Sequence, residues 1–511
     1  MHASLPPIAL GAGPLTLEDV AEVARGRGVT LAADPARIAG GAAFLAGLLA
    51  RGHEVYGVTT GYGDSCTVQV APDLVPELPL HLTRYHGCGL GRILDPAETR
   101  AVLAARLNSL ALGFSGVRWE LLAALAALLN RGVLPRIPAE GSVGASGDLT
   151  PLSYVAATLV GERDALYDGR VLPAAEALRE AGLAPITLFP KEGLALMNGT
   201  AAMTGLACLA THRAGYLERF ATRLTALAVA ALRGNRDHFH PRFFQLKPHP
   251  GTLRAAVRAY EDLGGAPGTE DPARLQDRYS VRCAPHVIGV LGDALAWIRR
   301  DLETELNSAN DNPLIDAEAG LLFHGGHFYG GHVAFAMDGL KNAVASLADL
   351  MDRQLALLVD VRYNQGLPMN LSGAEGRRAA LNHGLKAVQI GASAWTAEAL
   401  KLTMPATAFS RSTECHNQDK VSMGTIAARD ALRVLELAEQ VAASLALAVV
   451  QALRIRERQG IAAAERLAPE ARSFLEGLGS DLPFLDEDRP LDGVLSGLCD
   501  AVREQTWSLY P

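Results

Sequence analysis

The segment from Val333 to Leu358 repeats apolar residues at intervals of three and four, and this pattern constrains the fold more than any other feature of the chain. The apolar stripe consists of Val333, Met337, Leu340, Val344, Leu347, Met351, Leu355 and Leu358. This spacing places every member on one face of a single long helix. Polar residues such as Asp338 and Arg353 fall between them. A helix with one apolar face must bury that face against other elements.

Similar helical patterns run through residues 97–130, 199–233 and 425–456. Together they predict a mainly α-helical protein with a central bundle of long helices. Few segments alternate with a period of two, so only a small β component is expected, near Val68–Val70 and Leu321–Phe323. Glycine clusters at 57–63, 87–91, 141–147 and 325–331 interrupt the helical patterns and predict functional loops.

The expected division has three parts. Residues 1–200 form a glycine-rich N-terminal domain, residues 201–455 the central bundle, and residues 456–511 a C-terminal helical segment.

Composition excludes several classes of protein. The formal net charge is −8 and no Lys/Arg-rich run occurs, which argues against a nucleic-acid partner. The longest apolar runs, such as Ala442–Ala452, fall short of the roughly 18 residues that a membrane span needs. The N-terminus lacks a signal-peptide pattern, and six scattered cysteines without CxxC pairs indicate reduced thiols. We therefore expect a cytoplasmic protein that does not enter a membrane.

The run Gly141–Ser153, GSVGASGDLTPLS, carries the strongest chemical signal. Gly147 has no Cβ, so its amide nitrogen can approach the carbonyl carbon of Ala145, which is itself small. Ser146 can then lose its hydroxyl as water. The product is a 4-methylideneimidazol-5-one ring, a carbon electrophile that needs no external cofactor. Asp148 is expected to cap the helix that follows. The plainer reading is a flexible loop before a capped helix.

Four further motifs are candidates for the same site: Tyr56–Gly63 (YGVTTGYG), Leu194–Thr200 (LALMNGT), Gln276–Cys283 (QDRYSVRC) and Glu414–Asp419 (ECHNQD). With the Ala-Ser-Gly run, and in this order, they resemble the aromatic amino acid lyase family. That family includes histidine, phenylalanine and tyrosine ammonia-lyases and tyrosine aminomutases. The resemblance extends from about Val55 to Ile455. It implies a mainly helical homotetramer whose active sites each take residues from three chains.

The resemblance also implies residue roles. Tyr56 would be the base that takes the β-proton, with its pKa tuned downward by positive charge or helix ends. Tyr279 would assist formation of the ring from Ala145, Ser146 and Gly147, and Arg282 would hold the substrate carboxylate by a bidentate pair. The remaining expected substrate contacts are Tyr85, His86, Asn198, Gln276, Phe328, Glu414, Asn417 and Gln418. His327 and His286 depart from the family, which usually has Asn and Gln there.

Tyr85-His86 aligns with the family's ring-selecting pair, which is apolar in phenylalanine lyases. A histidine can hydrogen-bond a phenol or an imidazole, whereas against a bare phenyl ring it stays unpaired. Gln418 stands where histidine lyases have Glu. The combination favours L-tyrosine, giving 4-coumarate. Histidine (giving urocanate) and a 2,3-aminomutase reaction stay open as alternatives.

Two other classes of protein compete with the lyase. A metalloenzyme could use His324, His327 and His332, or His238 and His240, but neither spacing fits a common zinc pattern, and no metal site is expected. A non-catalytic helical scaffold would have no need for an intact Ala-Ser-Gly sequence, Tyr56 and Arg282.

Overall fold

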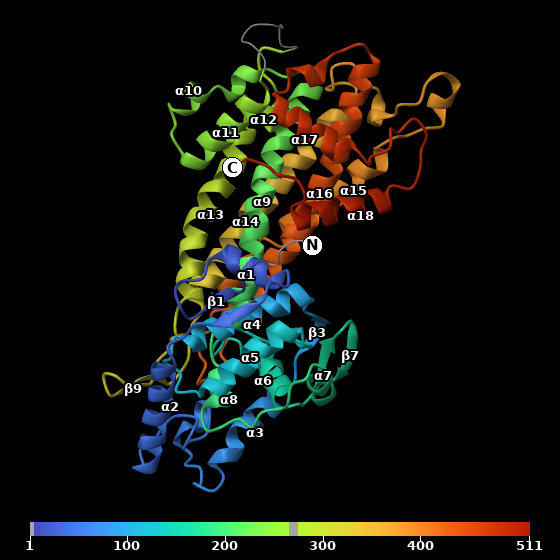
Figure 1. Ribbon diagram of the computed structural model, residues 1–511. Coiled ribbons are helices and arrows are strands. Elements are labelled where there is room, and N and C mark those ends of the chain that lie inside the picture. Colours follow the sequence, from blue (N-terminus) through green and yellow to red (C-terminus); the bar gives the residue numbers. More distant parts are fainter. Residues whose placement is uncertain (1–4, 265–273, 511) are drawn as a thin grey trace. The chain divides into compact units, whose positions relative to one another are not determined.

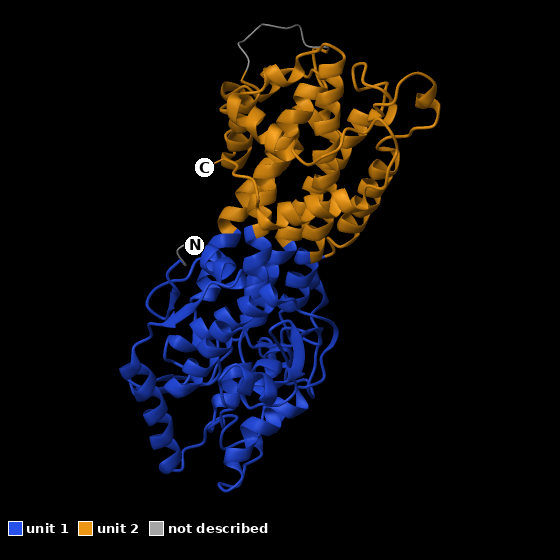
Figure 2. Cartoon of the chain, turned by 45° about the vertical axis from the view of Figure 1, so that its right-hand side comes forward, with its two compact units in different colours: residues 1–212, 298–338, 405–432 blue, residues 213–297, 339–404, 433–511 orange. Residues whose placement is uncertain are grey.

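A computed structural model describes residues 5–264 and 274–510 of the chain. The protein is mainly helical, with a few short strands, which confirms the expected fold class (Figure 1). It forms two compact units, each assembled from three separate stretches (Figure 2). Unit 1 comprises residues 1–212, 298–338 and 405–432, and unit 2 comprises residues 213–297, 339–404 and 433–511. The division at residues 200 and 455 follows the order of the chain and stays a prediction.

Four long helices contribute residues to both units: α9 (Ala201–Ala231), α13 (Ala284–Leu306), α14 (Gly331–Val359) and α16 (Gly424–Arg458). The apolar stripe predicted on α14 is confirmed, because all eight of its members are completely buried. Within unit 2, the Arg456 guanidinium of α16 donates to the carbonyl oxygen of Ala231 in α9 at 2.9 Å. Gln354 of α14 donates to Thr225 of α9 at 3.0 Å. These contacts place α9, α14 and α16 side by side there.

Helix α16 is long and apolar enough to cross a membrane by length and composition. However, 89 % of its most apolar window is buried inside the protein, as in the core helix of a globular domain.

Unit 1 contains shorter helices and all the strands found in the described residues. Its helices are α1 (Leu17–Ala24), α2 (Pro35–Ala50), α3 (Leu78–Tyr85), α4 (Pro96–Ala111), α5 (Trp119–Arg131), α6 (Leu149–Leu159), α7 (Ala174–Glu180) and α8 (Glu192–Met197). Its strands are β1 (Ile8–Leu10), β2 (Val29–Leu31), β3 (Leu90–Ile93), β4 (Leu134–Pro135), β5 (Pro138–Glu140), β6 (Asp164–Tyr167), β7 (Arg170–Pro173), β8 (Leu314–Asp316) and β9 (Leu321–Phe323). β1 and β2 pair in parallel, whereas β3–β5, β4–β6–β7 and β8–β9 are antiparallel.

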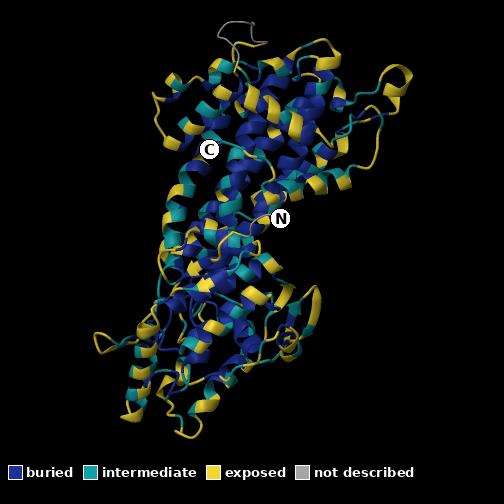
Figure 3. Ribbon diagram, in the orientation of Figure 1, coloured by how far each residue is buried: buried dark blue, intermediate teal, exposed yellow. Residues whose placement is uncertain are grey.

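Unit 2 adds α10 (Pro241–Phe244), α11 (Pro250–Asp262), α12 (Tyr279–Arg282), α15 (Lys386–Lys401), α17 (Pro469–Gly479) and α18 (Asp492–Glu504). Short 3₁₀ turns occur at Gly63–Thr67, Val75–Glu77, Arg236–Phe239, Met369–Leu371, Gly376–Ala380, Ala406–Phe409 and Ala463–Arg466. Buried residues are concentrated in the interior of each unit (Figure 3).

Two details differ from the sequence expectation. The helical pattern over residues 97–130 is two helices, α4 and α5, because Gly113 and Gly116 between them adopt left-handed φ values of 86° and 64°. The strand expected at Val68–Val70 is absent, and only an isolated bridge joins Gln69 to Thr60. The strand at Leu321–Phe323 is present as β9.

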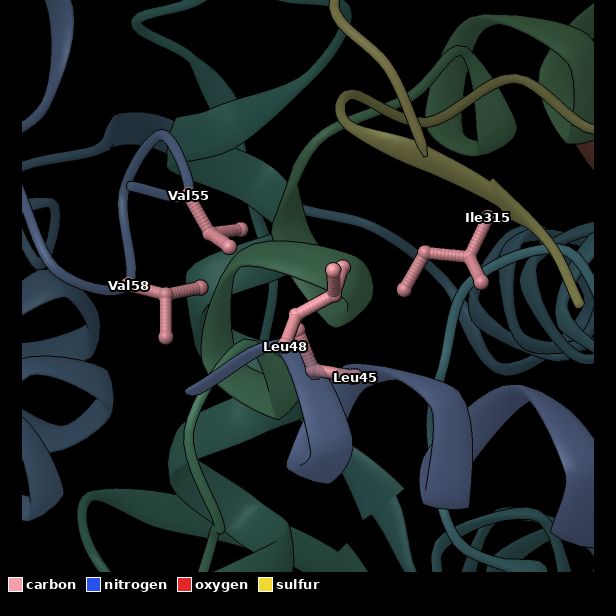
Figure 4. Packing of buried hydrophobic residues seen from close by; sticks show 5 residues of the cluster. All are labelled: Leu45, Leu48, Val55, Val58 and Ile315. Atoms are coloured by element: carbon pink, nitrogen blue, oxygen red, sulfur yellow. The ribbon is translucent and has the colours of Figure 1, made fainter. Parts of the chain in front are cut away.

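A small apolar cluster in unit 1 anchors the base of the first glycine loop. Leu45 and Leu48 of α2 pack with Val55, Val58 and Ile315, and each of these side chains is less than a tenth exposed (Figure 4). Tyr56 stands between the buried Val55 and Val58 in the sequence. The cluster therefore fixes the backbone from which the Tyr56 ring extends.

Candidate active site

Two neighbouring cavities in unit 1 contain most of the predicted site residues. The larger, of about 660 Å³, is lined by Tyr56, Tyr85, His86, Ala145, Ser146, Asn198, Glu414 and Gln418 among others. The smaller, of about 270 Å³, is lined by Tyr56, Ala145, Ser146, Phe328, Asn417 and Gln418 among others. Tyr56, Ser146 and Gln418 border both cavities and therefore stand at their common wall.

The loop that contains Ala145, Ser146 and Gly147 has a backbone that few sequences can adopt. Ser146 has φ 51°, while Gly144 and Gly147 have φ 71° and 72°. A Cβ on Gly147 would overlap the carbonyl of Gly199. The Gly199 amide donates to Ser146 O at 3.2 Å, and the Asp148 amide donates to Gly199 O at 2.9 Å. The loop is thus clamped against Gly199, which explains the glycine at position 147.

Asp148 stands at the N-cap position of α6, but its side chain makes no cap bond to that helix. Its buried carboxylate instead accepts from the Met203 amide of α9 at 2.8 Å and from the hydroxyls of Thr425 and Ser142. The expected cap on α6 is therefore wrong. Because it is fully buried, the pKa of Asp148 is raised to about 6, although its hydrogen bonds oppose that shift.

Behind Asn198 lies a layer of buried charge. The fully buried Arg106 donates to Asn198 O at 2.8 Å, and Lys191 pairs with Asp311 at 2.5 Å. The side-chain oxygen Oδ1 of Asn198 is buried and has no hydrogen-bond partner within the described chain. An unsatisfied buried acceptor costs about 1–3 kcal/mol, so this atom is available to a group that enters the cavity.

The Tyr56 hydroxyl accepts a hydrogen bond from the Gly63 amide at 2.8 Å. Burial is the largest influence on this residue and raises the pKa of the phenol. The Gly63 N–H lowers it, and the negative charge of Glu414 raises it further. The downward tuning expected from the sequence is therefore not achieved within unit 1, where an anion and not a cation is the charge that acts on Tyr56.

The loop 414–418 also contacts Ser146. Glu414, Cys415 and His416 are consecutively left-handed, with φ values of 50°, 53° and 64°. The Glu414 carboxylate accepts from the Asp64 amide at 2.9 and 3.0 Å. Gln418 accepts from Thr413 at 2.8 Å and donates to Ser146 Oγ at 3.3 Å. Gln418 therefore contacts the loop that contains Ala145, Ser146 and Gly147 directly.

His86 ends helix α3 and its ring lies on the wall of the larger cavity. The ring of Tyr85 lies beside it, 4.5 Å between centroids. Burial, and secondly the charge of Arg163, lower the pKa of His86 to about 4. At neutral pH its imidazole is uncharged and offers one donor and one acceptor.

Three predicted site residues, Gln276, Tyr279 and Arg282, belong to unit 2 and line neither cavity. Tyr279 is 71 % exposed. The Arg282 guanidinium lies 4.7 Å from the centroid of the Tyr279 ring, and its Nε has no hydrogen-bond partner within the described chain. His286 packs against Phe244, 5.2 Å between ring centroids.

Several cavity residues were not predicted from the sequence. Leu82, Leu194 and Tyr62 line the larger cavity. Leu82 is four residues before His86, so helical spacing on α3 was the signal that could have revealed it. Arg106 is invisible to pattern analysis because it occupies a helix buried on nearly all sides.

The metal-site alternatives can also be compared with the structure. Among the described residues, no three His, Cys, Asp or Glu side chains are grouped so as to hold a metal ion. The His238 ring nitrogen instead accepts from the Asp277 amide at 3.0 Å. All six cysteines lie in the described ranges and are free thiols.

The model of the family described as aromatic amino acid lyase matches residues 15–476. The chain belongs to the aromatic amino acid lyase family. Aromatic amino acid lyases are carbon–nitrogen lyases, so this chain is an enzyme whose substrate class is aromatic amino acids.

Relatives within the aromatic amino acid lyase family differ in their named substrates. The histidine ammonia-lyase of Gloeobacter violaceus is 41 % identical, over 93 % of this chain and 91 % of the relative. The tyrosine ammonia-lyase of Cereibacter sphaeroides is 37 % identical, over 96 % and 97 %. The tyrosine aminomutase of Streptomyces globisporus has a solved structure that matches with a TM-score of 0.90 and 36 % identity, over 98 % and 97 %. These similarities identify the substrate class but not the individual ring.

Proposed function

We propose that this enzyme eliminates ammonia from L-tyrosine to give 4-coumarate. The observation that carries the proposal is the position of His86, whose uncharged imidazole lines the same cavity as Tyr56 and Ser146. A neutral imidazole can pair with a phenol hydroxyl. A phenyl ring would leave it unpaired, at a cost of about 1–3 kcal/mol.

The residues present fit a 4-methylideneimidazol-5-one derived from Ala145, Ser146 and Gly147. Gly147 lies so close to Gly199 that a Cβ on Gly147 would overlap the Gly199 carbonyl, and a Cβ on Gly199 would overlap Arg106 and Asn310. The orphaned Oδ1 of Asn198 and the amide of Gln418 supply polar contacts at the same place. When formed, this group supplies an electrophilic carbon for the substrate amine.

The chain's own side chains then have separate tasks in the proposal. Tyr56 takes the β-proton of the substrate. The Gly63 N–H, which already donates a hydrogen bond to the Tyr56 hydroxyl, favours the phenolate form. Asn198 and Gln418 orient the amino acid, while Phe328 borders the smaller cavity beside Ser146. Glu414 and Asn417 complete the polar wall on the side of the 414–418 loop.

We further propose that Gln276, Tyr279 and Arg282 act in the site of a neighbouring copy in a cytoplasmic homotetramer. Support comes from the exposure of Tyr279 and from the position of all three residues outside both cavities of unit 1. An arginine delivered in this way would hold the substrate carboxylate. Its charge would also lower the pKa of Tyr56, which burial and Glu414 hold up.

Two alternatives have specific support. A histidine lyase is favoured by the 41 % identity to a histidine ammonia-lyase, and His86 could also pair with an imidazole. An aminomutase is favoured by the match to a tyrosine aminomutase structure.

Separate incubations with tyrosine, phenylalanine and histidine test the proposal. The conjugated acid is followed by near-ultraviolet absorbance and β-amino acids by chromatography. We expect tyrosine to give the highest kcat/KM and 4-coumarate as the main product. Faster turnover of histidine, or β-tyrosine as the main product, would replace the proposal by the corresponding alternative.

His86→Leu tests the residue that carries the proposal. Loss of one buried hydrogen bond is expected to lower kcat/KM for tyrosine about 10- to 100-fold, while phenylalanine becomes the better substrate. Ser146→Ala serves as the inactive control. The measured mass of Ser146→Ala should equal the mass calculated from its sequence. The wild-type chain should be lighter than its calculated mass by two waters.

A further inference from the structure

The guanidinium of Arg163 packs against the segment that carries His86. Arg163 connects α6 to β6 and has a left-handed backbone, with φ 63°. Its carbonyl oxygen accepts from the Ala174 amide at 2.7 Å, which holds this conformation. The left-handed region favours glycine, because a residue with a Cβ is strained there. Arg163 occupies it nonetheless, and its side chain makes several contacts.

The Arg163 guanidinium is held by three contacts. It donates to Thr83 O in the last turn of α3 and to Ser153 Oγ at 3.0 Å. Its central carbon lies 4.3 Å from the centroid of the Tyr154 ring. A Cβ on Gly87 would overlap the guanidinium, so the loop has a glycine where the cation passes.

The partners of Arg163 extend to both sides of the ring-reading histidine. Ser153 Oγ lies 3.1 Å from His86 O and 2.7 Å from Thr150 O, where its single proton can be donated. The Tyr154 hydroxyl accepts from the Gly89 amide at 3.1 Å. Arg163 thus bonds position 83 directly and holds Ser153 and Tyr154, the α6 residues that contact positions 86 and 89. Helix α6 follows the Ala145-Ser146-Gly147 loop.

We propose that Arg163 is a positioning residue for ring selection, which fixes the His86 imidazole against the cavity by bracing the backbone from Thr83 to Gly89. The inference rests on the proposed function, since it assumes that His86 reads the substituent of the substrate ring. The charge of Arg163 also favours the uncharged form of the imidazole, because, in addition to burial, it lowers the pKa of His86.

The first test measures the brace without any substrate. In Arg163→Met, hydrogen–deuterium exchange of the amides of residues 86–90 should accelerate about tenfold, the effect of one lost hydrogen bond, while residues 141–147 keep their wild-type rates. The matched control is Arg84→Met, which removes the exposed ion pair between Arg84 of α3 and Glu162, the residue before Arg163, and should leave the exchange unchanged. Unchanged exchange at residues 86–90 in Arg163→Met would overturn the proposal, whichever substrate the enzyme prefers.

The second test separates selection from general damage. In Arg163→Met, kcat/KM for tyrosine should fall about tenfold, while the value for phenylalanine stays within about threefold of wild type. An equal fall for both substrates would contradict the proposal. If the wild type prefers histidine, the proposed substrate is wrong, and the same ratio is measured for histidine over phenylalanine. If Arg163→Met does not fold, Arg163→Lys replaces it, since lysine keeps the charge but lacks the two-pronged guanidinium, and the same selective loss is expected.

Discussion

Asp148 illustrates how single buried groups determine the geometry of the site. Its carboxylate connects the loop of Ala145, Ser146 and Gly147 to the first turn of α9 and to Thr425 at the start of α16. Each of those helices begins with unsatisfied amides, so a negative charge there is favourable. Burial opposes the charge and raises the pKa of Asp148 to about 6.

This raised pKa predicts a pH dependence of stability. An acid whose folded pKa lies above its unfolded value near 3.8 stabilises the fold below that value and loses this contribution as the pH rises through about 6. The unfolding free energy of the wild type should therefore fall by roughly 1–3 kcal/mol relative to Asp148→Asn between pH 4 and pH 6.5. Chemical denaturation of both proteins across this range measures the difference. A constant difference would show that Asp148 does not titrate there.

At the residue scale, local motifs pointed to side chains that the structure places close together, while their roles stay predictions. Tyr56, His86, Ser146 and Gln418 were all singled out by their motifs, and the structure brings them to one pair of cavities. The sequence could not predict which groups bind the Asp148 carboxylate or what the Arg163 side chain contacts. It also could not predict that the pKa of Tyr56 is raised. Each depends on contacts between segments that are distant in sequence, and a motif reports only its own neighbours.

At the scale of elements, glycines set how closely helices approach. In unit 1, Gly205 of α9 faces α4, and a Cβ built on Gly205 would lie 2.7 Å from the carbonyl carbon of Ala101. Further along α9, a Cβ on Gly215 would meet nothing within 4 Å. The two glycines therefore stand in the same helix with opposite packing requirements.

Substituting these glycines should give opposite effects. Gly205→Ala forces α4 and α9 apart and should cost about 1–3 kcal/mol of unfolding free energy. Gly215→Ala, its matched control, should stabilise the protein by about 0.5–1 kcal/mol through helix propensity alone. Denaturation midpoints of the two variants decide the matter, and similar midpoints would contradict the close approach of α4 and α9.

The elements themselves were largely predictable, because 3.6-residue periodicity over a long stretch indicates one helix regardless of its surroundings. The stripe of α14 and the extents of α9 and α16 follow from it. The break between α4 and α5 was missed, because the apolar spacing on both sides of Gly113 and Gly116 was taken as one continuous pattern, although both glycines adopt a left-handed backbone. The run of left-handed residues from Glu414 to His416 has no glycine and so gave no sequence signal at all.

For the whole molecule, the distribution of site residues between units leads to a complementation experiment. Tyr56→Phe and Arg282→Ala should each be inactive when expressed alone. If each site takes Tyr56 and Arg282 from different chains, co-expression of the two variants should restore a fraction of wild-type turnover. Mixed oligomers without activity would show that both residues serve their own chain. A Tyr56→Phe, Arg282→Ala double variant co-expressed with Ser146→Ala controls for how many chains one site requires.

The interleaved order of the two units could not be read from the sequence, since periodicity reports local structure and not which stretches pack together. The order also has a consequence for how the enzyme matures. The loop around Ser146 is completed by late residues, because the Met423 amide donates to Val143 O at 3.0 Å and Ser422 donates to Gly144 O at 3.2 Å. A ribosome must therefore release more than four-fifths of the polypeptide before that loop can take its final shape. Under the proposed function, ring formation at Ser146 would have to wait for this point, so nascent chains stalled earlier would carry an ordinary serine.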